Sequence, residues 1–197
     1  MSTYKAFEVR EETEKKFVGA IVEKSALELV EGSVSIEVHY SSVNYKDALS
    51  ASGSKAVTRE YPHVPGIDAA GTVLASTDSN FAVGDEVVVT GYDLGMNTAG
   101  GFGQQVTVPG GWVTKLPVGL SLHDSMVLGT AGLTAGLCVN KLLFNGITPE
   151  AGKVLVTGAT GGVGIIACAL LVKLGFEVVA STGKLAEAAK LKALGVS

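Results

Sequence analysis

The sequence has few cysteines, few histidines and few charged residues, and each shortage narrows what the protein can do. Its two cysteines, Cys138 and Cys168, lie in apolar helix-like segments, so we expect small buried side chains and no disulfide framework. The three histidines, His39, His63 and His123, are dispersed, and we expect each to be a surface or loop residue. Zinc sites need several Cys, His or carboxylate ligands at suitable spacing. No such cluster occurs in the sequence, which therefore predicts a protein without bound metal.

Charge and hydropathy exclude further classes of partner. Lysine and arginine are scattered without a basic cluster, so we expect no nucleic-acid partner. Residues 1–10 are charged and lack the apolar core of a secretory signal, and no uninterrupted apolar run reaches membrane-spanning length. The hydrophobic content of 47% suffices for substantial cores. The sequence therefore predicts a cytoplasmic globular protein with no membrane partner.

The last 45 or so residues have the pattern of a strand, a glycine-rich turn, a helix and a second strand. Residues 154–156 form a short apolar run typical of a strand buried in a parallel sheet. Residues 165–174 are apolar and long enough for a helix that ends at Gly175. A second apolar strand over 176–180 and a helix over 184–194 follow. This order and these lengths predict a βαβ unit.

The turn between the first strand and the helix reads Ala159-x-Gly161-x-x-Gly164, a variant of the dinucleotide-binding pattern G-x-G-x-x-G. Glycines let the backbone approach a pyrophosphate closely, and the helix N-terminus offers it unpaired N–H groups and a partial positive charge. The alternative is a tight turn that binds no ligand. The predicted cofactor contacts in this turn are Thr160, Gly161, Gly162, Val163 and Gly164.

The end of the second strand indicates which dinucleotide binds. An NAD site normally places Asp or Glu ~20 residues after the glycines, where the carboxylate bonds the ribose hydroxyls and repels a 2′-phosphate. This sequence instead has Ser181, Thr182, Gly183 and Lys184, whose hydroxyl groups, flexible backbone and ammonium group suit a phosphate. We therefore predict NADPH as the cofactor. The alternative is that Ser181 and Thr182 only cap the next helix.

Residues 1–120 have a different pattern, with many short strands separated by polar turns. Residues 33–40 alternate polar and apolar side chains, as a half-exposed strand does, and residues 86–90 form another strand. This pattern predicts a compact β-rich, barrel-like domain. Ser121 and Asp124 then resemble a capping box, and helical spacing continues toward Phe144. We place a second domain, of α/β class, over residues 121–197.

Five motifs in order resemble those of the medium-chain dehydrogenase/reductase superfamily, over nearly the whole chain. They are Asn44-Tyr45-Lys46-Asp47, Pro65-Gly66-Ile67-Asp68-Ala69-Ala70-Gly71, Gly84-Asp85-Glu86-Val87, Gly129-Thr130-Ala131-Gly132 and the glycine turn that ends at Gly164. The sequence is similar to the zinc-free quinone-oxidoreductase-like branch, and closest to NADPH-dependent acrylyl-CoA reductases. The resemblance implies a GroES-like catalytic domain over 1–120. It also implies a Rossmann NADP-binding domain over 121–197, from which later strands and a C-terminal return segment are absent.

The resemblance also implies which residues surround the reaction. The Tyr that matches Tyr45 lies against the cofactor in the family, so Tyr45 would position the nicotinamide or relay a proton. Asn44 and Asp47 would orient Tyr45 and the substrate, and Thr130 resembles a residue near the nicotinamide-side phosphate or ribose. Structural alternatives exist for each: a core aromatic for Tyr45, a helix cap for Asn44, a solvated side chain for Asp47 and helix packing for Thr130.

The expected reaction uses hydrogen bonds rather than metal. Zinc-dependent relatives have a Cys near residues 44–47 and a His-Glu pair after Pro65-Gly66, where this sequence has Tyr45-Lys46 and Ile67-Asp68. Hydride addition to an alkene conjugated with a carbonyl suits such a site, because hydrogen-bond donors can stabilise the developing enolate. We expect an enoyl-CoA such as acrylyl-CoA as substrate, with a quinone as the alternative.

A non-catalytic role is the competing hypothesis. In this hypothesis the protein binds a dinucleotide weakly or only supports an assembly. The sequence contains two strands of a nucleotide-binding sheet that normally has about six, so we expect this polypeptide alone to be inactive. Unprotected strand edges favour self-association, so we also expect a homo-oligomer.

Overall fold

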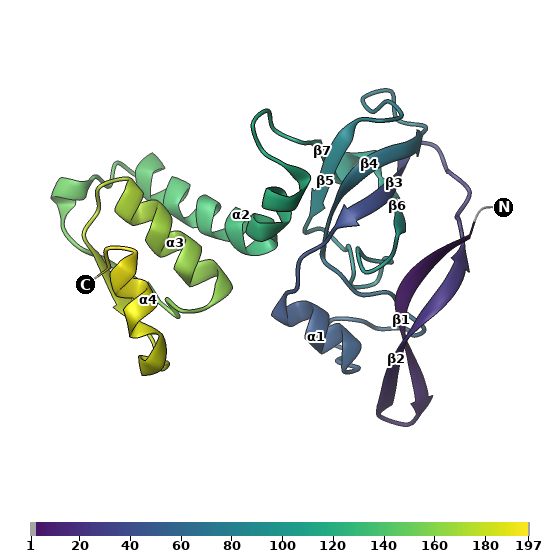
Figure 1. Cartoon of the computed structure of the whole chain (residues 1–197), viewed down its shortest axis with the longest axis horizontal. Coiled ribbons are helices and arrows are strands. Elements are labelled where there is room, and N and C mark those ends of the chain that lie inside the picture. The colour runs from purple at the N-terminus through teal and green to yellow at the C-terminus, as the bar shows by residue number, and fades with distance from the viewer. Residues whose placement is uncertain (1–2, 197) are drawn as a thin grey trace. The chain divides into compact units, whose positions relative to one another are not determined.

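The computed structural model describes residues 3–196, and the chain divides into two compact units, residues 1–130 and 131–197. The first unit consists mainly of strands, and the second combines a parallel strand pair with helices (Figure 1). The predicted fold class, a β-rich domain followed by part of an α/β domain, is confirmed. The predicted domain division after residue 120 stays a prediction, although the compact units divide later in the chain.

The first unit is built on a curved five-stranded antiparallel sheet (Figure 1). Its strand order is β6-β3-β4-β5-β7. The strands are β3 (Ser33–Tyr40), β4 (Asp68–Ser76), β5 (Glu86–Thr90), β6 (Gln105–Pro109) and β7 (Val113–Lys115). A 3₁₀ turn, η1 (Gly110–Trp112), joins the last two. The predicted strands 33–40 and 86–90 are confirmed, and the sheet curls around its own core as the barrel-like pattern predicts.

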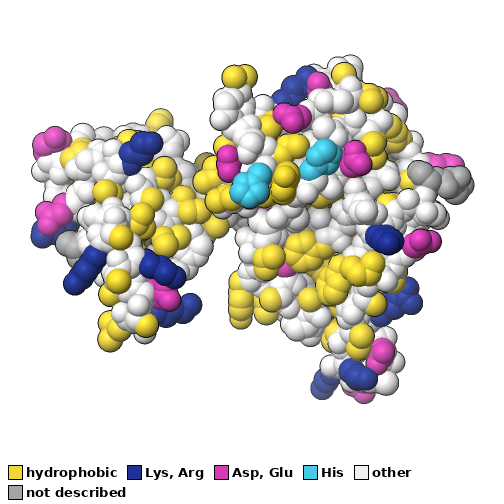
Figure 2. Space-filling view, viewed as in Figure 1, with side chains coloured by type: hydrophobic (Ala, Val, Ile, Leu, Met, Phe, Trp, Pro, Cys, Tyr) yellow, Lys and Arg dark blue, Asp and Glu magenta, His cyan; other side chains and the backbone are white. Residues whose placement is uncertain are grey.

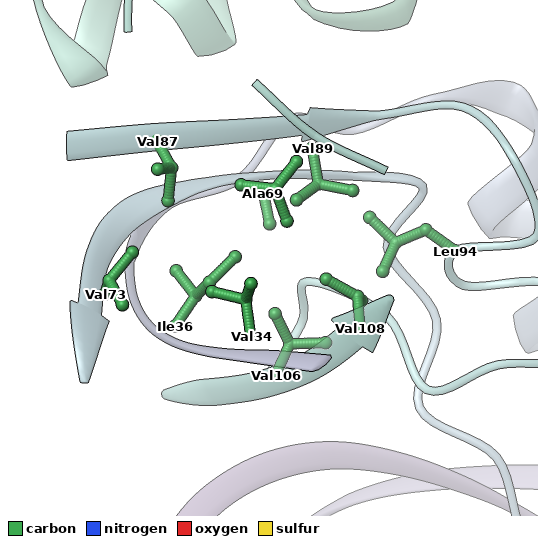
Figure 3. Close-up of a cluster of buried hydrophobic side chains, with 10 residues drawn as sticks. Val34, Ile36, Ala69, Val73, Val87, Val89, Leu94, Val106 and Val108 are labelled. Atoms are coloured by element: carbon green, nitrogen blue, oxygen red, sulfur yellow. The ribbon is translucent and has the colours of Figure 1, made fainter. Parts of the chain in front are cut away.

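The core of this unit is rich in valine, a β-branched residue that packs well on a pleated surface (Figure 3). Figure 3 shows side chains from β3, β4, β5 and β6 pointing toward one another. The expected half-exposed alternation of β3 is wrong for its first half, because Ser33, Val34, Ser35 and Ile36 are all buried. The buried serines are satisfied: Ser33 Oγ donates to a backbone carbonyl, and Ser35 Oγ accepts from Gln105 Nε2 at 2.7 Å.

An N-terminal hairpin of β1 (Thr3–Thr13) and β2 (Lys16–Ser25) extends from the sheet. β1 is joined to the segment before β6 by backbone hydrogen bonds, from Phe7 N to Phe102 O at 2.8 Å and from Gln104 N to Lys5 O at 2.9 Å. The hairpin also covers His63, whose backbone pairs with that of Val9. His63 is therefore buried and not on the surface, although it lies in the loop before β4, as the expectation of a surface or loop position allows.

Two helices complete the first unit: α1 (Tyr45–Ala51) and the start of α2 (Leu122–Phe144). The predicted cap of α2 is confirmed, because Ser121 Oγ accepts the Asp124 N–H at 3.0 Å and donates to the Asp124 carboxylate at 2.8 Å. By length and apolar composition alone, α2 could cross a membrane. However, Gly129 has non-helical dihedral angles, so neither of its two helical pieces has the ~20 residues that a membrane span requires.

The second unit contains the predicted βαβ arrangement. Its elements are β8 (Val154–Thr157), α3 (Gly162–Lys173), β9 (Val178–Ser181) and α4 (Ala188–Ala193), with short 3₁₀ turns η2 (Pro149–Ala151) and η3 (Leu185–Glu187). β8 and β9 pair in parallel, as predicted. Cys168 is buried in the core of this unit as expected, whereas Cys138 on α2 is exposed, which corrects the expectation of two buried cysteines.

On the face that Figure 2 shows, Lys and Arg alternate with Asp and Glu instead of gathering into one patch of a single sign. Hydrophobic side chains also reach this face in small groups.

Candidate active site and cofactor site

Asp47 is a buried residue near the N-terminus of α1. One carboxylate oxygen accepts the Asn44 N–H at 2.7 Å, and the other accepts the N–H groups of Ile67 at 2.9 Å and Gly66 at 3.2 Å. Burial raises the pKa of Asp47 above the ordinary aspartate value, and the N–H groups of Asn44 and Ile67 oppose that shift. Asp47 thus joins the start of α1 to the loop before β4, so it is not a solvated side chain.

Asp68, the first residue of β4, is 0% exposed and accepts hydrogen bonds from two other segments. Its Oδ2 accepts Asn44 Nδ2 at 2.9 Å, the Thr130 backbone N–H at 2.9 Å and the Ser42 hydroxyl. Its Oδ1 accepts the Thr130 hydroxyl at 2.7 Å. Two predicted site residues, Asn44 and Thr130, therefore meet on one carboxylate.

Asp68 itself was not among the site residues predicted from the sequence. The available signal was an acidic residue at the start of an apolar strand, Ile67-Asp68-Ala69-Ala70, since a buried aspartate needs several hydrogen-bond donors. The sequence could not show which donors these are, because they come from segments 24 and 62 residues away.

Gly129 allows Thr130 to approach Asp68. It interrupts α2 with φ 49° and ψ −154°, a conformation that favours glycine. A Cβ atom on Gly129 would lie 2.7 Å from Asp68 Oδ2 and 3.0 Å from Ser42 Oγ, which is too close. The backbone N–H of Thr130 can bond the carboxylate because residue 129 has no side chain.

Tyr45, the first residue of α1, is 81% exposed. The alternative that Tyr45 is a core aromatic is therefore wrong. Asn44 precedes the helix as its N-cap, with extended dihedral angles of φ −119° and ψ 157°. The helix-cap alternative for Asn44 is confirmed, and its side-chain amide also donates to Asp68 Oδ2 at 2.9 Å. The catalytic roles of both residues stay predictions.

The glycine turn joins β8 to α3 within the second unit. Gly158 has φ 60°, which starts the tight turn. A Cβ atom on Gly164 would lie 2.3 Å from Gly158 O, so the third position of the motif must be glycine for the helix to pack against the turn. At Gly161, a Cβ atom would lie 3.2 Å from the same oxygen, a much milder contact.

The turn fits a bound pyrophosphate. The first N–H groups of an α-helix have no partner within the helix, and Gly161 at the N-cap of α3 has no side chain that could cap them. Gly161, Gly162 and Val163 are exposed, so these N–H groups are open to an anion. A cavity of about 460 Å³, lined largely by apolar residues of α2, β8 and α3, borders the same turn.

The predicted 2′-phosphate contacts lie together at the end of β9. The Thr160 and Thr182 hydroxyls are 2.8 Å apart, and Thr182 Oγ1 also accepts the Lys184 N–H at 3.0 Å. Ser181 O accepts the Ala159 N–H at 3.2 Å, which fixes the glycine turn beside the strand end. The N-cap of η3 is Lys184, and the N-cap of α4 is Glu187. The alternative that Ser181 and Thr182 cap the next helix is therefore wrong.

The described residues offer no candidate metal centre. Among residues 3–196, no group of three or more His, Cys, Asp and Glu side chains lies close enough to hold a metal ion. His39 and His123 are partly exposed side chains, in keeping with the sequence expectation for these two.

Comparison with known proteins gives a family and several close relatives. Residues 30–118 match the model of the alcohol dehydrogenase GroES-like domain. The chain is 53% identical over 173 residues to YhfP of Bacillus subtilis, whose name as a quinone oxidoreductase is provisional (88% of this chain, 52% of that protein). It is 45% identical over 188 residues to the acrylyl-CoA reductase AcuI of Ruegeria pomeroyi (95% of this chain, 57% of that protein).

Solved structures of related oxidoreductases have the same fold as this chain. The YhdH oxidoreductase of Salmonella enterica in complex with NADP superposes with a TM-score of 0.93 at 44% identity, covering 98% of this chain and 59% of that one. YhfP with NAD bound superposes with a TM-score of 0.94 at 47% identity, covering 100% and 60%. The chain therefore spans little more than half the length of the relatives that it matches.

Proposed function

Because the chain belongs to the medium-chain dehydrogenase/reductase superfamily, in its zinc-free quinone-oxidoreductase-like branch, we propose that its protein is an NADPH-dependent reductase of activated carbon–carbon double bonds. The favoured substrate is an enoyl thioester such as acrylyl-CoA, and the favoured setting is a soluble cytoplasmic enzyme that forms homo-oligomers. The observation that carries the proposal is the glycine turn, where uncapped N–H groups of α3 lie beside Thr160, Thr182 and Lys184.

In this proposal, the second unit binds the adenine-side half of the cofactor. The N–H groups of residues 162–164 hold the pyrophosphate, and Gly161 leaves room for it. Ser181, Thr182, Gly183 and Lys184 surround the 2′-phosphate, and the hydroxyl pair of Thr160 and Thr182 supplies a donor to it. The relative YhdH binds NADP and YhfP was solved with NAD, so the preference must be measured on this protein.

The first unit supplies the groups around the reaction. NADPH, when bound, supplies the hydride that reduces the double bond. Tyr45 is exposed at the helix start, where it can contact the nicotinamide, while Asn44 and Thr130 are held in place by Asp68. Asp47 supports the site by fixing α1 to the loop before β4, because its carboxylate accepts the backbone N–H groups of Asn44, Gly66 and Ile67.

The choice of substrate rests on the relatives. AcuI of Ruegeria pomeroyi is an acrylyl-CoA reductase, and YhfP is named for quinone reduction, so a quinone remains the second candidate. Both candidate substrates contain a carbonyl group conjugated with a carbon–carbon double bond, so the two can be compared in one assay.

The test is an assay on the purified full-length protein. NADPH oxidation is followed at 340 nm with acrylyl-CoA and, separately, with a soluble benzoquinone. We expect turnover with acrylyl-CoA and a higher kcat/KM than with the quinone. Turnover with the quinone alone would favour the second candidate, and NADPH binding without turnover of either would favour a non-catalytic role.

A further inference from the structure

Tyr92, in the loop after β5, has an unusual backbone conformation. Its φ is 54°, in the left-handed region that bulky side chains rarely adopt. The chain on both sides fixes this conformation, because the Gly91 N–H donates to Ile67 O at 3.3 Å and Leu94 is fully buried in the core. Glycine would adopt it at lower cost. A strained tyrosine at an exposed position therefore indicates a use for its side chain.

The ring of Tyr92 lies flat against Trp112. The two ring centroids are 5.4 Å apart and the ring planes differ by only 7°. Trp112 is partly buried and packs against the valine-rich core, which fixes its plane. Tyr92 is nevertheless 62% exposed. Because one face of its ring contacts Trp112, the opposite face is the open one, and it is a flat surface held in a fixed orientation.

This open face belongs to the same end of the sheet as the polar cluster around Asp68. Thr90, the last residue of β5, is paired with Asp68, the first residue of β4. Tyr92 follows Thr90 by two residues, a span of at most about 7 Å of chain. The Asp68 carboxylate also accepts the amide of Asn44, the N-cap of the helix on which Tyr45 is exposed. The stacked ring thus lies near the groups of the first unit that the proposed function places around the reaction.

We propose that Tyr92 is a specificity-determining residue of the substrate site, whose open ring face stacks on the planar conjugated group of the substrate. The proposal rests on the proposed function, since it assumes a substrate in which an alkene is conjugated with a carbonyl. A quinone offers a whole ring to this face, whereas an acrylyl thioester offers only a short planar chain. Tyr92 therefore sets how well the site accepts a quinone relative to an enoyl thioester. The alternative is that Tyr92 only shields Trp112 from water.

The experiment compares two substrates on the full-length protein with saturating NADPH. The KM of acrylyl-CoA is measured first, with propionyl-CoA formation followed by chromatography. Duroquinone is then added as a competitor, and its inhibition constant reports its binding whether or not it is reduced. Its four methyl groups block the ring carbons to which a thiol such as the exposed Cys138 could add.

The variants separate the aromatic plane from the backbone conformation. Tyr92→Phe keeps the ring, and Tyr92→Leu removes it. Tyr92→Asn is a second variant without the ring, and asparagine tolerates left-handed dihedral angles, so this variant stays folded even if leucine is not accommodated. Phe144→Leu is the matched control, because it replaces an aromatic residue of the second unit that is 81% exposed. Thermal melting verifies the fold of each variant.

We expect Tyr92→Leu and Tyr92→Asn to raise the inhibition constant of duroquinone about three- to tenfold. The KM of acrylyl-CoA should rise less than twofold in both. Tyr92→Phe should keep the wild-type values, because its ring can occupy the same plane. Phe144→Leu should change neither constant.

The outcomes that overturn the proposal are distinct from those that overturn the proposed function. A wild type that turns over neither substrate removes the function and this inference with it. An active wild type that duroquinone does not inhibit, or an unchanged inhibition constant in Tyr92→Leu and Tyr92→Asn, removes the role of Tyr92 alone. Equal weakening toward both substrates would show a change in the general shape of the site and also count against the proposal.

Discussion

The hydroxyl groups of Thr160 and Thr182 are hydrogen-bonded at 2.8 Å, which joins the turn after β8 to the residue after β9. The chain thus forms a polar cluster at the place where NAD-dependent proteins normally have a carboxylate. The Lys184 backbone N–H donates to Thr182 Oγ1 at 3.0 Å, so this lysine follows the cluster directly and we expect its ammonium group to contact a 2′-phosphate.

Replacing Lys184 by Glu should remove the preference for NADPH. A charge-assisted bond to phosphate contributes roughly 1.5–3 kcal/mol, so we expect the wild type to bind NADPH at least about tenfold more tightly than NADH. Lys192→Glu makes the same change of charge on α4 and serves as the control. Titration of both cofactors measures the effect, and equal affinities in the wild type would refute the assignment.

Substitution of Gly161 should block the pyrophosphate without disturbing the turn. Gly161 has φ −80°, so a side chain is compatible with its backbone, and a Cβ atom would meet only Gly158 O at 3.2 Å. We expect Gly161→Val to abolish NADPH binding while the first unit stays folded by circular dichroism. Gly164→Ala would instead damage the turn itself, because its Cβ atom would lie 2.3 Å from that oxygen. Normal NADPH affinity in Gly161→Val would mean that the turn is only structural.

Acidification should destabilise the first unit through His63. Burial lowers the pKa of His63 below its ordinary value, while a hydrogen bond to the Gly95 backbone and the nearby Asp93 oppose the shift. The unfolded chain then takes up a proton at a higher pH than the folded chain, so stability is lost as the pH falls below ~6.5.

The asparagine variant isolates this effect. His63→Asn cannot titrate, so between pH 7 and 5 its free energy of unfolding should fall less steeply, by up to ~1.4 kcal/mol per pH unit. Urea unfolding at several pH values measures both slopes. Parallel slopes would show that His63 does not change its protonation on unfolding.

Enzymatic activity of the full-length protein should survive exhaustive chelation. The prediction follows from the sequence, and within residues 3–196 no three metal-binding side chains gather. Activity is compared before and after dialysis against a chelator, with metal content measured by elemental analysis. Stoichiometric zinc together with loss of activity would contradict a metal-independent reaction.

The 197-residue polypeptide produced alone should lack turnover and self-associate. Among the described residues, β8 pairs only with β9, and Leu155 on β8 is 62% exposed. Leu155→Lys should reduce association, whereas Val118→Lys, at an exposed valine of the first unit, should not. Light scattering after size exclusion gives the oligomeric state, and a wild-type monomer with normal turnover would disprove the prediction.

The sequence predicted the elements whose causes are local. The strand over 33–40, the cap at Ser121 and the βαβ unit after residue 153 all depend on patterns within about ten to thirty residues. The glycine turn is of the same kind, because backbone geometry alone demands glycine at residue 164.

Features that depend on distant residues were missed. The burial of both faces at the start of β3 results from its pairing with β4 and β6 and from the core beneath it. Asp68 accepts hydrogen bonds from donors, such as the Thr130 N–H, that are distant in sequence and approach it only in the folded chain. The exposure of Tyr45 could likewise not be predicted from its neighbours in sequence. Burial and hydrogen-bond partners are tertiary properties, and single-sequence patterns report them poorly.

The hydrogen bonds between Lys5 and Gln104 also bear on how the chain folds during its synthesis. β1 is made first, but its partner at residue 104 is made 99 residues later, which takes about 5–20 s at ordinary rates of translation. Until then β1 is held by its hairpin with β2, which alone is marginally stable, and by the backbone pairing of Val9 with His63. The strand that leaves the ribosome first therefore gains its last backbone partners, Phe102 and Gln104, only after about half of the chain has been made.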